Sequence, residues 1–225
     1  ICLENHPFYG IELDEEQKVF RDSIWGKDNI VTICNAKAGS GKTTIALGVA
    51  NLLVQYGLYN EIVYIVAPTM EQKQGFIPGD PDDKNAPYMQ PLVDALITLN
   101  IEPGIAIKSN NNLRAIKEGK SYISFMSHTY LRGTNFENKV IIVDECQNFY
   151  ADELKKVLTR MHDSNKILLI GHEGQCDLLK HKEKNGFRIY LDAFEKIKDD
   201  KRVAICELKT NHRGWFSNFC DDVEF

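Results

Sequence analysis

Long apolar runs, cysteine pairs and an excess of basic residues are all missing from this sequence of 225 residues. No apolar stretch approaches the roughly 20 residues that a membrane-spanning helix needs. The longest ones, such as IVYIVAP, have the length of a strand. The first residues, ICLENHPFYG, lack the basic start and apolar stretch of a secretory signal. These absences predict a cytoplasmic protein with no membrane partner.

The six cysteines include no C-x-x-C pair, which argues against a disulfide framework. Cys34, Cys146 and Cys206 interrupt or flank apolar, strand-like segments. Such placement is typical of buried, reduced thiols in a cytosolic protein. The formal net charge is −5, so any contact with nucleic acid has to come from a local basic surface.

Short apolar segments alternate with helical periodicity along most of the chain. This alternation predicts an α/β fold whose mostly parallel sheet carries helices on both faces. Hydrophobic residues make up 43% of the sequence, enough for the core of a single domain that we take as residues 1–225. The expected strands are 29–34, 61–68, 122–126, 139–145, 166–171 and 203–209. The expected helices are 13–24, 43–57, 151–161 and 188–200.

Residues 68–122 break this alternation, because they hold most of the prolines and a polar run from Ser109 to Asn112. We expect an elaborated insertion after the second strand. It is predicted to contain one helix over 88–99 and a hairpin near 105–125.

The segment AKAGSGKTT lies between an expected strand and a strong helix, which is the setting of a phosphate-binding P-loop. Gly39 and Gly41 let the backbone turn its N–H groups toward a phosphate, and the helix start adds more donors. Lys42 is predicted to reach the β- and γ-phosphates, and the Thr43 hydroxyl to hold Mg²⁺. The predicted ATP contacts are Ala36, Lys37, Ala38, Gly39, Ser40, Gly41, Lys42, Thr43 and Thr44. Ala36 stands where this motif usually begins with glycine.

The segment KVIIVDECQN places Asp144 and Glu145 directly after four apolar β-branched residues. The carboxyl ends of parallel strands converge on the ligand crevice. We therefore expect Asp144 to hold Mg²⁺ through water and Glu145 to polarise the water that attacks the γ-phosphate. Two adjacent acids fit hydrolysis better than transfer to a small acceptor.

Two weaker signals follow later strands. Gln175, in GHEGQ, is a candidate for sensing the γ-phosphate or its attacking water. Arg213, in TNHRG, is a candidate arginine finger, acting in cis or across a subunit boundary. Glutamine and arginine in loops are also ordinary surface residues, so the sequence leaves both roles open.

Together these segments resemble the PhoH-like family of phosphate-starvation-inducible ATPases, which is related to superfamily 1 helicases. The resemblance extends from about residue 14 to residue 213. It rests on AKAGSGKT, APTMEQKQGFIPGDPDDKNAPYMQPLVDAL, SHTYLRGTNFENKVIIVDECQN and LTRMHDSNKILLIGHEGQCDL. It implies a RecA-like P-loop NTPase core, hydrolysis of ATP with Mg²⁺, action on RNA or single-stranded DNA, and a homo-oligomer that is often a hexameric ring. It also implies that Gln17 reads adenine, and it places Arg132 and Gly133 on the family's Arg-Gly element.

The sequence departs from the family pattern at two places. His172 stands where the family usually has Asp, which puts that position's share of Mg²⁺ or water organisation in doubt. TNHRG is closer to the Asn-x-Arg of superfamily 1 helicases than to the usual PhoH ending. Because the sequence stops soon after Arg213, we expect no second RecA-like lobe and a finger supplied by a neighbouring subunit.

Contact with nucleic acid has less support from the residues themselves. The basic clusters over 180–188 and 108–120 are candidates for phosphate contact, and Phe187, Tyr122 and Tyr130 for stacking on bases.

Three other functions remain open: a P-loop kinase or phosphotransferase, a GTP switch, and an ATP-binding module with little hydrolysis. The sequence has no Asn-Lys-x-Asp for reading guanine and no obvious Arg-rich lid. His172 keeps the binding module open.

Overall fold

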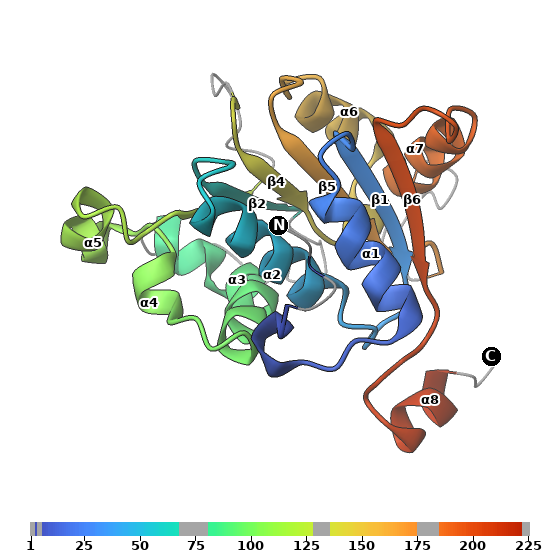
Figure 1. Ribbon diagram of the computed structural model, residues 1–225, viewed down its shortest axis with the longest axis horizontal. Coiled ribbons are helices and arrows are strands. Elements are labelled where there is room, and N and C mark those ends of the chain that lie inside the picture. Colours follow the sequence, from blue (N-terminus) through green and yellow to red (C-terminus); the bar gives the residue numbers. More distant parts are fainter. Residues whose placement is uncertain (1–2, 4–5, 68–80, 128–135, 175–184, 222–225) are drawn as a thin grey trace.

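Six parallel strands form one sheet in the order β3-β2-β4-β5-β1-β6 (Figure 1). The computed structural model describes residues 3, 6–67, 81–127, 136–174 and 185–221, without the side chains of 81–87 and 221. The strands are β1 (Val31–Ala36), β2 (Ile62–Val66), β3 (Ile123–Ser127), β4 (Val140–Val143), β5 (Lys166–Gly171) and β6 (Val203–Leu208). The predicted α/β fold with a parallel sheet is confirmed.

The central strands are buried along their whole length. Every residue of β2, β4 and β5 is buried. Continuous apolar, β-branched strands of this kind are expected where helices cover both faces of a parallel sheet.

Helices cover both faces of the sheet (Figure 1). One hydrophobic cluster joins the sheet to α1 (Glu15–Trp25), α2 (Lys42–Gln55) and α3 (Pro81–Thr98). A second cluster joins the opposite face to α6 (Ala151–Leu158) and α7 (Gly186–Glu195). Side chains of β2 alternate between them: Tyr64 belongs to the first cluster, and Val63 and Ile65 belong to the second.

The described part of the insertion between β2 and β3, from residue 81 on, is helical. It contains α3, α4 (Pro103–Ala106), η2 (Asn110–Asn112) and α5 (Leu113–Lys117). The predicted hairpin near 105–125 is wrong, because Ser109 and Asn112 form a capping box that starts a helical turn. Ile107 makes only an isolated parallel bridge to Ile123.

The remaining elements are η1 (Phe8–Gly10), η4 (Cys146–Asn148) and α8 (Trp215–Asp221). Cys34, Cys146 and Cys206 are free and buried, as predicted, and burial raises the pKa of each thiol. In the described part of the chain, no helix combines the length and the apolar character needed to cross a membrane.

Candidate active site

The loop between β1 and α2 has the shape of a phosphate cradle. Gly39 and Gly41 have φ angles of 72° and 79°, in the left-handed region that glycine adopts at little cost. Gly41 is the N-cap of α2, so the first N–H groups of this helix lack intrahelical acceptors. The Ser40 side chain is buried, and its Oγ has no hydrogen-bond partner within the described residues.

The start of α2 and the end of β4 meet at the carboxyl edge of the sheet. The Thr43 hydroxyl donates to Asp144 Oδ2 at 2.7 Å. Lys42 Nζ lies 3.2 Å from Glu145 Oε1 in an ion pair. The structure therefore brings together the two predicted phosphate and metal residues of the loop and the two predicted acids.

Asp144 is fully buried. Burial and the neighbouring Glu145 raise the pKa of this carboxyl from its ordinary value, and the ammonium of Lys42 opposes them. Its oxygens accept further hydrogen bonds from the Tyr64 hydroxyl and from the backbone N–H of Glu145. Asp144 is thus held in one orientation by donors on both sides.

Glu145 is oriented by a residue for which the sequence suggested no role. The Gln147 amide donates to Glu145 Oε2, and its oxygen accepts from the His172 backbone N–H at 3.0 Å. Gly171 makes room for this contact, because a Cβ there would lie 3.0 Å from Gln147 Oε1. Gln147 therefore links the acidic pair to the end of β5. The only available signal was its place in DECQN.

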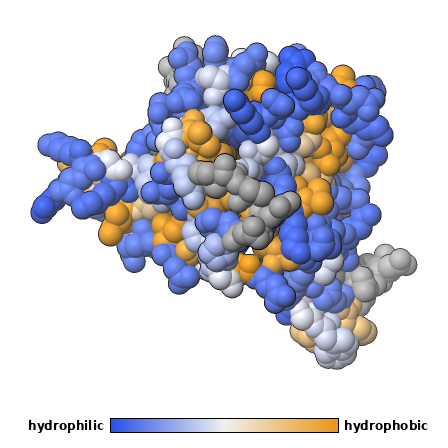
Figure 2. Space-filling model, in the orientation of Figure 1, coloured by the Kyte–Doolittle hydropathy of each residue, from blue (hydrophilic) through white to orange (hydrophobic). Residues whose placement is uncertain are grey.

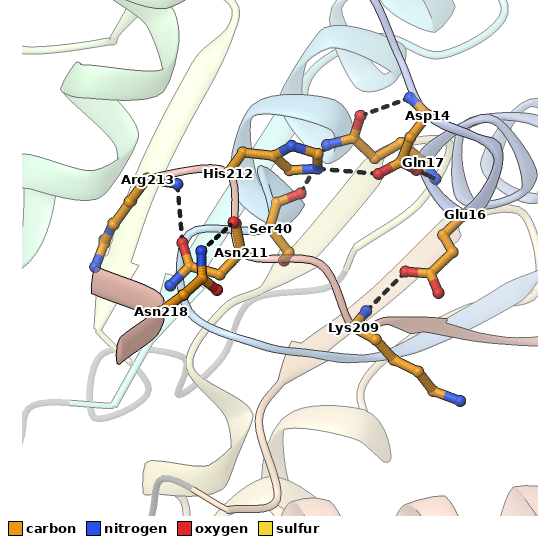
Figure 3. A network of polar contacts seen from close by, with 9 residues as sticks. All are labelled: Asp14, Glu16, Gln17, Ser40, Lys209, Asn211, His212, Arg213 and Asn218. Carbon is orange, nitrogen blue, oxygen red and sulfur yellow. Dashed lines mark hydrogen bonds and ion pairs between the residues drawn. The ribbon is translucent and has the colours of Figure 1, made fainter. Parts of the chain in front are cut away.

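The segment after β6 folds over the P-loop (Figure 3). The His212 N–H donates to the Gly39 carbonyl at 2.9 Å. A Cβ on Gly39 would overlap Asn211 Oδ1 and would lie 2.9 Å from Arg213 Cγ. Asn211 Oδ1 in turn accepts from the Arg213 N–H at 2.9 Å. Arg213 therefore lies beside the P-loop of its own chain.

The start of α1 joins the same network (Figure 3). Gln17 closes a capping box with Asp14, and its Nε2 donates to the Ser40 carbonyl at 2.9 Å. His212 Nε2 lies 2.9 Å from Asp14 Oδ2. Gln17 is thus placed against the P-loop, with its amide oxygen accepting from the Asp14 N–H; that it reads adenine stays a prediction.

The remaining predicted residues either lie outside the described part of the chain or are buried or paired, which does not suit contact with nucleic acid. Gln175, Arg132, Gly133 and residues 180–184 lie outside the described residues. The prediction that Phe187 stacks on bases is wrong, because its side chain is fully buried in the α6–α7 layer. Much of the basic cluster over 108–120 is paired with acids: Lys108 with Glu61, and both Arg114 and Lys120 with Glu118.

The donor set fits a magnesium nucleotide. A Thr hydroxyl and a carboxylate are the hard oxygen ligands that Mg²⁺ prefers. Lys42 and the glycine-shaped loop supply positive charge and N–H donors for phosphate oxygens. Ser40 Oγ, which has no hydrogen-bond partner in the part of the chain that the structure describes, leaves a further polar group at the loop.

Two solved structures are similar to the chain over most of its length. The Sulfolobus solfataricus SWI2/SNF2 ATPase core in complex with dsDNA matches with a TM-score of 0.46 and 15% identity, over 88% of this chain and 45% of that one. The Pif1 helicase from Candida albicans matches with a TM-score of 0.43 and 14% identity, over 94% of this chain and 43% of that one.

Two curated proteins have a higher sequence identity to the chain than these structures do. The chain is 35% identical over 182 residues to Protein PhoH2 of Bacillus subtilis (strain 168), covering 79% of this chain and 40% of the relative. It is 30% identical over 194 residues to Protein PhoH of Escherichia coli (strain K12), covering 85% of this chain and 51% of the relative. The chain thus spans about half or less of the length of these curated relatives. The profile of the family described as PhoH-like protein matches residues 12–213. The chain belongs to the PhoH-like protein family, as the four sequence segments predicted.

Proposed function

We propose that this protein binds ATP together with Mg²⁺ and hydrolyses it to ADP and phosphate. The observation that carries the proposal is the meeting of Thr43 with Asp144 and of Lys42 with Glu145 at one edge of the sheet. In this arrangement the predicted phosphate-binding loop faces both a metal-holding carboxylate and a base.

The chain's own residues divide the reaction between them. Lys42 leaves Glu145 to bind the β- and γ-phosphates, and Glu145 then accepts a proton from the attacking water. Oxygen of that water bonds to the γ-phosphorus as the bridging P–O bond to ADP breaks. Gln147 keeps the Glu145 carboxylate oriented throughout. Thr43 and Asp144 would hold Mg²⁺, which neutralises charge on the phosphates when it is bound.

We also propose that hydrolysis is coupled to single-stranded RNA or DNA. In the described structure, three side chains of α8 offer exposed aromatic surface: Trp215 at 78%, Phe216 at 70% and Phe219 at 58% exposure. The Trp215 and Phe219 rings are stacked at 5.9 Å. Exposed aromatic faces bind successive bases by stacking. α8 stands away from the sheet at the lower right of Figures 1 and 2 and begins two residues after Arg213.

Steady-state ATP turnover, measured with and without single-stranded RNA and DNA, tests the proposal. We expect turnover to rise with one of these strands. Trp215→Ala should weaken that stimulation without changing basal turnover. Val19→Ala is the matched control, because Val19 is an apolar side chain with 61% exposure on α1.

Other outcomes would favour other functions. Turnover that requires a small-molecule acceptor and ignores nucleic acid would support a phosphotransferase. ATP binding without turnover in the presence of either strand would support a binding module.

A further inference from the structure

The Tyr64 hydroxyl contacts Asp144 but takes no direct part in the proposed reaction. Tyr64 lies at the centre of β2 and is fully buried. Its neighbours within the same hydrophobic cluster along the strand are Ile62 and Val66, so an aliphatic side chain would suit the position. A buried hydroxyl is costly unless it is hydrogen-bonded. This one donates to Asp144 Oδ2 at 2.5 Å, the short distance typical of a bond to a carboxylate.

The ring that carries this hydroxyl is firmly held. Tyr64 pairs with Phe125 of β3 in the strand register, and the two rings are stacked at 6.1 Å with an interplanar angle of 26°. Because the whole side chain is buried, its hydroxyl meets no solvent, and it is directed at Asp144. The donor therefore comes from a rigid part of the sheet rather than from a loop.

Tyr64 differs in this respect from the other two donors to Asp144. Thr43 belongs to the P-loop helix and, in the proposed function, also faces the metal. The N–H of Glu145 belongs to the same turn as Asp144 itself. Tyr64 alone among these three donors ties the carboxylate to a neighbouring strand, independently of the nucleotide loop.

We propose that Tyr64 is a positioning residue for the metal site: its hydroxyl fixes the Asp144 carboxylate in the orientation that holds Mg²⁺. This inference rests on the proposed function, because it requires that Asp144 serve a magnesium nucleotide. Hydrogen bonds from outer partners orient metal-binding carboxylates, and their loss typically costs about 10- to 100-fold in metal affinity or activity.

Tyr64→Phe tests the inference by removing only the hydroxyl, while the stacked ring remains. We expect the Mg²⁺ concentration that gives half-maximal binding of a fluorescent ATP analogue to rise about 10-fold or more. Binding of the same analogue in EDTA should stay unchanged, because Asp144 then has no metal to hold. The matched control is Tyr122→Phe, which removes a hydroxyl that donates to Asn51 Oδ1 at 2.6 Å beside the same cluster.

The outcomes separate this inference from the proposed function. A Tyr64→Phe protein with wild-type Mg²⁺ dependence would overturn the role of Tyr64 and leave the proposed function standing. Equal losses with and without Mg²⁺, or equal losses in Tyr122→Phe, would point to packing and would also overturn it. Wild-type protein whose ATP binding ignores Mg²⁺ would overturn both.

Discussion

Lys42 Nζ lies 3.2 Å from Glu145 Oε1, so the lysine of the P-loop is paired with the acid that we propose as general base. The side chains are 12% and 37% exposed, respectively, so the pair stands at the mouth of the site rather than in its core. A phosphate that binds Lys42 competes with Glu145 for the same ammonium. In the proposed function, nucleotide binding at Lys42 therefore also releases the base.

Glu145→Gln should separate binding from hydrolysis. The variant keeps the shape of the side chain but cannot act as a base, and its neutral amide competes less strongly for Lys42. We expect ATP affinity equal to or higher than wild type, and hydrolysis slower by ~10²-fold or more. Equilibrium binding and single-turnover phosphate release measure the two effects. Near-normal hydrolysis would remove Glu145 from the mechanism.

Gln147→Leu should lower turnover without abolishing ATP binding. The substitution removes both the amide that holds Glu145 and the oxygen that accepts from His172 N–H. Because the base remains but is poorly oriented, we expect a smaller fall in kcat than for Glu145→Gln, about 10-fold. Gln55→Leu, on the surface of α2 away from the acidic pair, is the control. A Gln147→Leu enzyme with wild-type kcat would show that Glu145 needs no such partner.

Gly39→Ala should destabilise the protein more than Gly57→Ala does. Both glycines have similar positive φ angles, 72° and 70°, so both alanines carry the same backbone strain of about 1–2 kcal/mol. A methyl group at Gly39 also collides with Asn211, whereas nothing lies within 4 Å of one at Gly57. Thermal or denaturant unfolding measures the difference.

A second substitution tests whether the extra cost of Gly39→Ala comes from the collision with Asn211. In an Asn211→Ala background, the cost of Gly39→Ala should move toward that of Gly57→Ala, because the collision with Asn211 Oδ1 is removed. Equal costs for the two glycine variants in the wild-type background would contradict the packing of the 211–213 segment on the P-loop.

Arg213→Ala tests whether the finger acts within one chain. An arginine that stabilises the transferring phosphoryl group is worth on the order of 10³-fold in kcat, so we expect a large loss of turnover with ATP binding kept. Because Arg213 lies beside its own P-loop, a mixture of Arg213→Ala and Glu145→Gln proteins should be no more active than the two measured separately. Recovery of activity in the mixture would show that the finger crosses a subunit boundary.

Lys166 makes the free energy of unfolding depend on pH in the alkaline range. Burial lowers the pKa of its ammonium to about 8, against a weaker opposing effect of Asp28. In the unfolded chain the group titrates near 10.4. Between about pH 8 and pH 10.4 the unfolded state therefore binds more protons, and the contribution of Lys166 to folding stability rises with pH.

Lys166→Met removes this titration. Relative to the variant, wild-type protein should gain ~1 kcal/mol or more of unfolding free energy between pH 8 and pH 10. Urea unfolding of both proteins across that pH range measures the gain. Lys198→Met, at an exposed lysine, is the control. A constant difference between wild type and Lys166→Met would contradict the lowered pKa.

The sheet and the acidic edge could be predicted because their signals are local. Short apolar runs marked each strand to within two residues, and the glycines and Asp144–Glu145 lie close to strand ends. The contacts that shape the site are not local. Nothing in the sequence around Asn211 indicates that it packs against Gly39. The apolar pattern of β2 likewise predicts a buried Tyr64 but not its hydrogen bond to Asp144. The prediction of a hairpin near 105–125 was wrong because Ser109 starts a helical turn.

Phosphate release from ATP in the presence of Mg²⁺, compared between wild type and Lys42→Ala, tests the central claim most directly. The P-loop geometry and the Thr43–Asp144 contact predict multiple turnovers by wild type, and loss of both ATP binding and phosphate release in Lys42→Ala. Equal phosphate release by the two proteins, or none by wild type with and without single-stranded RNA and DNA, would contradict the assignment of this site as an ATPase.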